Sequence, residues 1–292
     1  MSEVSERVLD RLDNLENIEP LLGSLRILSL STMQMALNRK ALMQTYKDEY
    51  YHILSLLQDA LPKNEVKQVI SDNNVPSGKV LLVVLGSERG ICGMYNKNLA
   101  SLASEWVDAQ EGLYQVLTFG EKLRQSLRQL DLAFENQGAM GKGAIPRYQK
   151  AQMMVYSWIK EYQRGELREV NILSFRKPTS GFYKPVITQL IPSPEGVDVK
   201  VSNTPAWPPP IIEGDPLLMI KRTIEHLTAI NFYELILESI AAENALRFNL
   251  LEEARENTRE LIESLVIEVQ IAKRQAITQE MLELASGAGL TQ

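Results

Sequence analysis

A stretch of 69 residues without glycine or proline, from Leu217 to Ala285, constrains this chain more than any other feature. Asp215 and Pro216 precede it directly, and these residue types are typical of an N-cap and of the first position of a helix. A helix of about 70 residues would be roughly 105 Å long, far longer than a compact domain needs. Since a helix of this length cannot bury an apolar face on itself, we expect it to have a long partner.

The second half of this stretch has an apolar stripe at the spacing of one helix face. Small residues alternate in it with leucine and valine, which suits two closely packed helices. The stripe comprises Leu250, Ala254, Thr258, Leu261, Leu265, Val269, Ala272 and Ala276.

The beginning of the chain is the expected partner. Residues 3–60 contain only one proline, Pro20, and one glycine, Gly23, and their apolar residues recur three and four positions apart. Pro20 leaves two alternatives, a kink inside one helix or a new helix that starts with Asn17 as its cap. In either case, we expect the two terminal helices to pack against each other as an antiparallel pair.

The middle of the chain alternates between strand and helix patterns, which favours a small, largely parallel sheet. The predicted strands are Lys79–Leu85, Tyr114–Phe119, Val170–Phe175 and Lys184–Ile191. The predicted helices are Asn98–Gln110, Glu121–Leu130 and Tyr148–Gln163. The expected fold class is therefore α/β: a long antiparallel coiled coil of the terminal helices plus a central Rossmann-like α/β domain.

We accordingly divide the chain into three segments. Residues 1–60 form the N-terminal coiled-coil helix, residues 75–195 the central α/β domain, and residues 211–292 the C-terminal coiled-coil helix. A proline-rich connector, Pro192–Pro210, joins the second segment to the third.

Composition argues against several classes of function. A net charge of -6 does not suggest a nucleic-acid partner. The sequence contains no run of eighteen apolar residues, so we expect no membrane span. The first twenty residues do not resemble a signal peptide, so we expect a cytoplasmic protein. A single cysteine, Cys92, and two distant histidines, His52 and His226, do not suggest a metal or catalytic site. We expect no cofactor.

A glycine-rich segment, Gly86–Gly93, follows the first predicted strand and superficially resembles a phosphate-binding loop. It lacks the Lys-Ser/Thr pair of a P-loop, and its glycine spacing is not that of a dinucleotide-binding fingerprint. We favour a tight strand-to-helix turn that needs its glycines for positive φ angles, with Cys92 as a small packed side chain.

Four motifs, in order, resemble the gamma subunit of F-type rotary ATP synthases. Ile277-Thr-Gln-Glu280 lies within a stretch similar to the family's C-terminal R-Q-A-A-I-T-Q-E-I, and Ser87–Gly93 is similar to its S-D-R-G-L-C-G, followed by Asn96 and Asn98. Glu243, Arg247 and Glu256-Asn257 match S-E-x-x-A-R and the following D-N, and residues 175–192 resemble the family's fourth-strand region. The resemblance covers nearly the whole chain.

The resemblance implies a rotor shaft with no catalytic site of its own. The terminal helices would turn inside a hexamer of alpha and beta subunits, and the α/β domain would be a foot that binds the epsilon subunit and the membrane ring of c subunits. The protein would then be peripheral, at the cytoplasmic face of the membrane. The implied hexamer contacts are Gln34, Lys273, Arg274, Thr278, Gln279 and Glu280, and the foot-domain turn comprises Ser87, Glu88, Arg89, Gly90 and Gly93.

The sequence also departs from the family pattern. The family's first helix is strongly basic, whereas residues 8–27 here are acidic and contain Pro20 and Gly23. Gln34 stands where the family has a lysine between two methionines, and Lys273 and Arg274 stand where it usually has Arg and Gln. The usual attraction between a basic shaft and acidic beta-subunit loops is therefore weakened.

Two other classes of function stay open at this point. A gamma-like scaffold could use its helical hairpin to bind a different assembly, and the acidic first helix favours that alternative. A nucleotide-using enzyme has less support, because the α/β segment has neither a phosphate fingerprint nor an acid–base pair.

Overall fold

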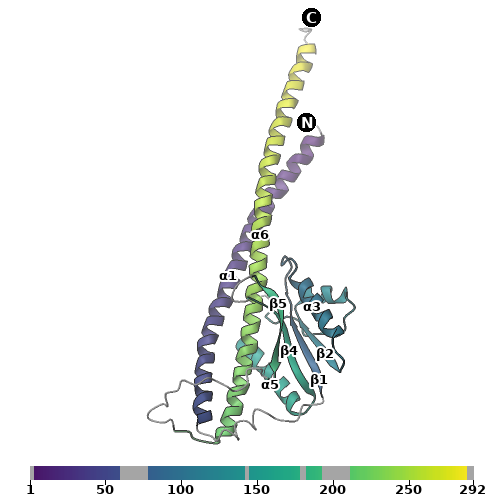
Figure 1. Cartoon of the computed structure of the whole chain (residues 1–292). Coiled ribbons are helices and arrows are strands. Elements are labelled where there is room, and N and C mark those ends of the chain that lie inside the picture. Colours follow the sequence, from purple (N-terminus) through teal and green to yellow (C-terminus); the bar gives the residue numbers. More distant parts are fainter. Residues whose placement is uncertain (1–2, 60–77, 142–144, 178–181, 193–210, 288–292) are drawn as a thin grey trace. The chain divides into compact units, whose positions relative to one another are not determined.

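A computed structural model describes residues 3–59, 78–141, 145–177, 182–192 and 211–287 (Figure 1). Most of the predicted connector, residues 193–210, lies outside these ranges. The chain divides into two compact units, one formed by Met1–Leu30 with Arg247–Gln292 and the other by Ser31–Leu246.

Two long helices account for nearly half of the sequence. Helix α1 spans Glu3–Asp59 and helix α6 spans Pro216–Gly287. Pro20 lies inside α1, so the alternative in which a new helix starts near Asn17 is wrong. The predicted start of α6 is confirmed, because a carboxylate oxygen of Asp215 accepts a hydrogen bond from the Leu217 backbone N–H at 3.0 Å.

In the first unit, the two helices run antiparallel, as predicted. Glu19 pairs with Arg255, and seven residues later on α1 Arg26 pairs with Glu252, three residues earlier on α6. The Arg26 guanidinium also lies 5.5 Å from the centre of the Phe248 ring.

The predicted stripe on α6 is correct in part. Thr258, Leu265 and Val269 are buried, but Leu261 is 48% exposed. Leu251 is fully buried, whereas its neighbour Leu250, which belongs to the predicted stripe, is only half-buried. A heptad-like seam of alternating three- and four-residue steps explains this correction, because one step of the wrong length moves the predicted face by about 100°.

In the second unit, the antiparallel pairing of α1 and α6 follows the same order. Lys40 pairs with Glu238 and Lys47 with Glu234. An apolar cluster closes the pair near the end of α1 and the start of α6, and it contains Leu54, Leu57, Ile220 and Leu227.

The second unit also contains a five-stranded sheet of order β3-β2-β1-β4-β5. Its strands are β1 (Lys79–Leu85), β2 (Tyr114–Phe119), β3 (Glu135–Asn136), β4 (Leu167–Arg176) and β5 (Lys184–Ile191). All neighbours pair in parallel except β4 and β5, so the prediction of a largely parallel sheet is confirmed. The two-residue strand β3 was not predicted, and β4 is longer than expected.

Helices cover both faces of this sheet. Successive side chains of β1 point to opposite faces and belong to two different apolar clusters. Leu81, Val83 and Leu85 pack with α5 (Tyr148–Gln163) and with α6, whereas Leu82 and Val84 pack with α3 (Tyr95–Asp108) and α4 (Glu121–Arg128). Helix α3 starts three residues earlier than predicted, and α4 ends two residues earlier. The central part is therefore a layered α/β fold in which α6 itself covers one face of the sheet.

Among the described residues, no helix is both long enough and apolar enough to cross a membrane.

Candidate functional site

The C-terminal end of α6 carries five of the six predicted hexamer contacts, and all five are exposed: Lys273, Arg274, Thr278, Gln279 and Glu280. The side-chain hydrogen bonds of this segment stay within the helix. The Thr278 hydroxyl donates to the Arg274 carbonyl at 2.8 Å, and the Gln279 amide donates to the Glu283 carboxylate at 3.3 Å. These polar side chains therefore have the rest of their hydrogen-bonding capacity available for a partner.

Large apolar side chains lie exposed on the same segment. Ile277, Met281, Leu282 and Leu284 are between 58% and 73% exposed. In the register set by Glu19 and Arg255, α1 starts opposite about residue 271 of α6. The last turns of α6 thus extend past their partner helix (Figure 1). An apolar helix end without its partner is typical of a surface that another protein covers.

The sixth predicted contact, Gln34, belongs to the second unit and is exposed on α1. It is close in sequence to Ala36, which is fully buried, and to Met35, which is 51% exposed. Gln34 and Met35 therefore form an exposed part of the α1 surface.

The two units differ sharply in charge. The first unit holds 14 acidic and 8 basic residues, and hence a net charge of -6, whereas the second holds 23 of each. The whole net charge of the protein therefore belongs to the helical pair of the first unit. A positively charged surface on a partner that encloses this unit would favour binding.

The foot-domain turn lies between β1 and α3 and is organised around a buried amide. The Asn96 side chain accepts a hydrogen bond from the Ser87 N–H at 3.0 Å and donates to the Ser87 hydroxyl at 2.7 Å. It also donates to the Cys92 sulfur at 3.4 Å. Because these groups bond to one another and are buried, they build the turn and do not present a phosphate-binding loop.

The glycines of this turn have different roles. Gly93 has a φ of 56°, as predicted, but Gly86 and Gly90 do not adopt the left-handed conformation. At Gly86 the reason is packing, since a Cβ there would lie 2.3 Å from the Leu123 Cβ. Within this turn, Ile91 also adopts a positive φ, at 57°, although it is not a glycine.

The outer side of the turn is exposed and partly apolar. Arg89 is exposed, and Ile91 and Met94 are 55% and 57% exposed, whereas Ser87 is fully buried. Of the five residues predicted for this turn, Glu88 and Gly90 are half-buried and Gly93 is exposed. The turn therefore offers a surface contact while its base holds β1 and α3 together.

Sequence reasoning missed the polar residues that attach the long helices to the sheet. The Glu238 carboxylate of α6 lies 2.9 Å from the Lys40 ammonium and 3.7 Å from the Arg176 guanidinium, and it accepts a hydrogen bond from the Lys177 N–H at 2.9 Å. Glu238 is largely buried. Burial of the Tyr183 hydroxyl raises the pKa of Tyr183, and the negative charge of Glu238 adds to this effect. One carboxylate thus joins α1, α6 and the end of β4.

A second attachment joins the same helix to β1. The Tyr95 hydroxyl donates to the Leu85 carbonyl at 3.0 Å and lies 2.7 Å from the Ser239 hydroxyl of α6. Nothing in the local sequence pattern identifies these partners, because they lie 10 and 144 residues from Tyr95.

The described part of the chain has no group of three or more His, Cys, Asp or Glu side chains that could hold a metal ion. Its two long helices and its sheet are instead joined by ion pairs and apolar clusters.

Comparison with known proteins finds similar proteins that cover most of this chain. A family model described as ATP synthase matches residues 5–289. The ATP synthase gamma chain of Geotalea daltonii is 28% identical over 219 residues, which are 73% of each chain. That of Glaesserella parasuis is 23% identical and covers 97% of this chain and 98% of its own. A chain of the Euglena gracilis mitochondrial ATP synthase, solved as OSCP/F1/c-ring, has a TM-score of 0.64 at 12% identity and covers 98% of this chain and 94% of its own.

Proposed function

This chain belongs to the gamma-subunit family of ATP synthases, and on that premise we propose that it is the central rotor shaft of such an enzyme. It couples ion flow through the membrane c ring to conformational change at the catalytic sites of the alpha and beta subunits. It is a non-catalytic subunit, since the chemistry of ATP belongs to the hexamer.

The observation that carries this proposal is the end of α6, which extends past α1 with its apolar side chains exposed. A bare helix end that presents Ile277, Met281 and Leu284 to water is costly unless a partner encloses it. An alpha/beta hexamer encloses it with smooth contacts, together with Lys273 and Arg274 on the same segment. Because this contact between the end of α6 and the hexamer has few directional hydrogen bonds, the shaft can turn inside the hexamer.

Rotation needs a foot that moves with the shaft. Glu238 and Tyr95 supply this connection, because they join α6 to α1, to β4 and to β1. Torque applied to the sheet is therefore carried to the helices through buried polar contacts as well as through the apolar core. Segments 1–60 and 211–292 thus act as the two helices of the shaft, and segment 75–195 acts as the foot.

The exposed side of the foot-domain turn, at Arg89 and Ile91, supports a contact with the epsilon subunit or the c ring. The shaft acts by presenting different side chains to each beta subunit as it turns. A beta subunit changes state because its contact free energy with the shaft differs between conformations. Through its partners, the protein is peripheral at the cytoplasmic face of the membrane.

The charge of the first unit supports a co-adapted hexamer. A net charge of -6 on the helix pair favours a collar lined with basic side chains. This sign is opposite to the basic shaft that the family resemblance implies, so the alpha and beta subunits of this enzyme are expected to differ from the usual ones in the same way.

Reconstitution with the alpha and beta subunits encoded nearby tests the proposal. We expect the chain to co-elute with the hexamer in size-exclusion chromatography and to raise ATPase activity above that of alpha and beta alone. If the folded chain elutes by itself and leaves the activity unchanged, the rotor function is wrong, and a scaffold for a different assembly takes its place.

A further inference from the structure

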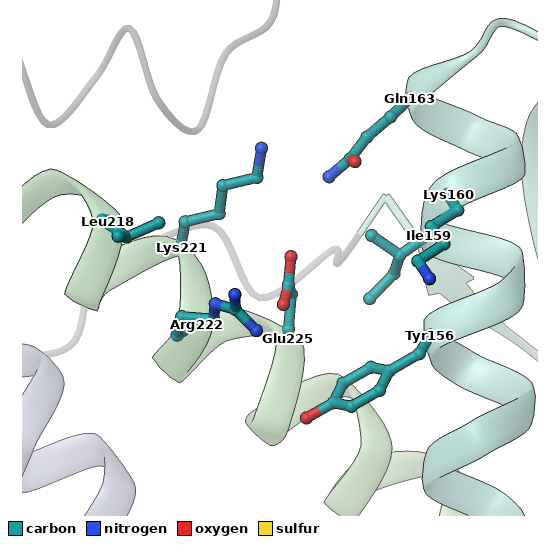
Figure 2. Close-up of a pocket in the computed structure, with 8 residues that line it drawn as sticks. All are labelled: Tyr156, Ile159, Lys160, Gln163, Leu218, Lys221, Arg222 and Glu225. Atoms are coloured by element: carbon teal, nitrogen blue, oxygen red, sulfur yellow. The ribbon is translucent and has the colours of Figure 1, made fainter.

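A groove lies between α5 and the first turns of α6, within the second unit (Figure 2). Its volume is about 400 Å³. The residues that line it are Tyr156, Ile159, Lys160, Gln163, Leu218, Lys221, Arg222 and Glu225.

Three cations and one carboxylate share this groove. Lys160 comes from α5, and Lys221, Arg222 and Glu225 come from α6. Lys221 and Glu225 have the four-residue spacing at which helical ion pairs form, yet within the described ranges none of the four groups makes an ion pair. The groove therefore has a net charge of +2 that the described protein does not neutralise locally.

The shape and the uncharged lining add to this pattern. Figure 2 shows Lys221 and Gln163 extending toward each other from two different helices, with the Glu225 carboxylate between these helices. Ile159 and the Tyr156 ring form an apolar wall, and the Tyr156 hydroxyl lies 3.3 Å from the His226 ring nitrogens. The wall is thus held in place from behind, while the charged groups face the opening.

We propose that this groove binds a phosphate monoester. A monoester carries close to two negative charges at neutral pH, which matches the local excess of +2. Lys221, Arg222 and Lys160 surround the phosphate, and Gln163 donates a hydrogen bond to it. Glu225 accepts a hydrogen bond from a hydroxyl or amine next to the ester. The phosphate monoester is the group that a small phosphorylated metabolite such as glycerol 3-phosphate shares with the headgroup of phosphatidic acid, whose glycerol carries no free hydroxyl.

The test uses the full chain by itself, so its result does not depend on the rotor assembly. Glycerol 3-phosphate is titrated by calorimetry, and vesicles of phosphatidylcholine with and without phosphatidic acid are used in flotation. We expect binding to at least one of the two phosphate sources, and no binding to phosphatidylcholine alone. Which source binds distinguishes a metabolite site from a lipid site.

A paired substitution assigns the binding to the groove. The double variant K221Q/R222Q should bind the phosphate source about tenfold more weakly or worse. The matched control K122Q/R128Q removes two exposed cations from α4 and should bind like the parent protein. Lys221 and Arg222 are exposed, so both variants should keep the parent melting temperature.

Removing the carboxylate gives a second, independent readout. The E225Q variant should bind inorganic phosphate more tightly, because a repelling charge is lost, and should gain less for glycerol 3-phosphate, whose hydroxyl exchanges a charged acceptor for a weaker neutral one. The proposal is overturned if neither phosphate source binds, if the α4 control weakens binding as much as the groove variant, or if E225Q changes both ligands equally.

Discussion

The Glu238 carboxylate lies 2.9 Å from the Lys40 ammonium, although 198 residues separate them in the sequence. Lys40 is on α1, and Glu238 is on α6 at the point where α6 covers the sheet. The same carboxylate accepts the Lys177 N–H at the end of β4. Within the second unit, this carboxylate therefore links α1 and α6 to the end of β4.

The E238Q variant should be less stable than the parent by about 1–3 kcal/mol, because a largely buried acceptor of a charged hydrogen bond is replaced by a neutral one. Urea denaturation followed by circular dichroism measures the loss. The control E260Q changes an exposed glutamate on the same helix and should leave the midpoint nearly unchanged. Equal midpoints for the two variants would show that Glu238 has no special role.

The pairing of Glu19 with Arg255 and Arg259 should make the first unit sensitive to acid. The hydrogen bond from Arg255, followed by that from Arg259 and by the positive charge of both, lowers the pKa of Glu19 below its ordinary value of 4.5. A lowered pKa in the folded state means that this stabilisation is present above pH 4.5 and is lost as the pH falls through the folded value.

Unfolding of the parent and of E19Q, measured from pH 7 to pH 3, tests this sign. The difference in stability between the two proteins should be largest at neutral pH and should shrink on acidification. A difference that stays constant or grows toward low pH would contradict the ion-pair assignment.

The exposed end of α6 should matter for the assembly and not for the isolated chain. Replacing Ile277 and Met281 together by serine should change stability by no more than about 0.5 kcal/mol per site, because both are more than half exposed. The same variant should lower the stimulation of ATPase activity in the reconstituted complex. The comparison variant L265S, at a buried position, should instead destabilise the chain itself.

The turn after β1 offers a test of packing against conformation. G86A should destabilise the protein by about 1–3 kcal/mol, because the added Cβ meets the Leu123 side chain and the Phe119 carbonyl. G90A should be nearly neutral, since nothing lies within 4 Å of a Cβ there and its φ is not left-handed. Denaturant midpoints compare the two, and similar losses would mean that both glycines serve backbone conformation.

The acidic character of the first unit should control how fast it meets its hexamer. Neutralising the exposed Asp10 and Asp13 as D10N/D13N should slow association with the cognate alpha/beta hexamer and reduce its dependence on salt. The control E105Q/D108N removes the same charge from exposed positions of α3 in the second unit. Faster association of D10N/D13N, as a basic shaft would give, would rule out a cationic collar.

Local patterns in the sequence were enough to predict most of the secondary structure. The absence of glycine and proline predicted α6 from its cap at Asp215, and short β-branched runs ended by glycine predicted β1 and β2 to the residue. These features depend on backbone conformation and on the period of the apolar residues. Both are set by residues that are close together in the sequence. The family resemblance rests on motifs of the same local kind.

The tertiary structure decided what neighbours in sequence do not. It showed that Leu251 rather than Leu250 is fully buried, because the period of an apolar stripe alone does not fix which of two adjacent leucines faces the partner helix. It also placed Lys40 against Glu238, and Leu123 against Gly86. Such contacts depend on how separate elements meet in space. A sequence pattern can therefore predict that a helix has an apolar face, but only the packed chain shows which side chains complete it.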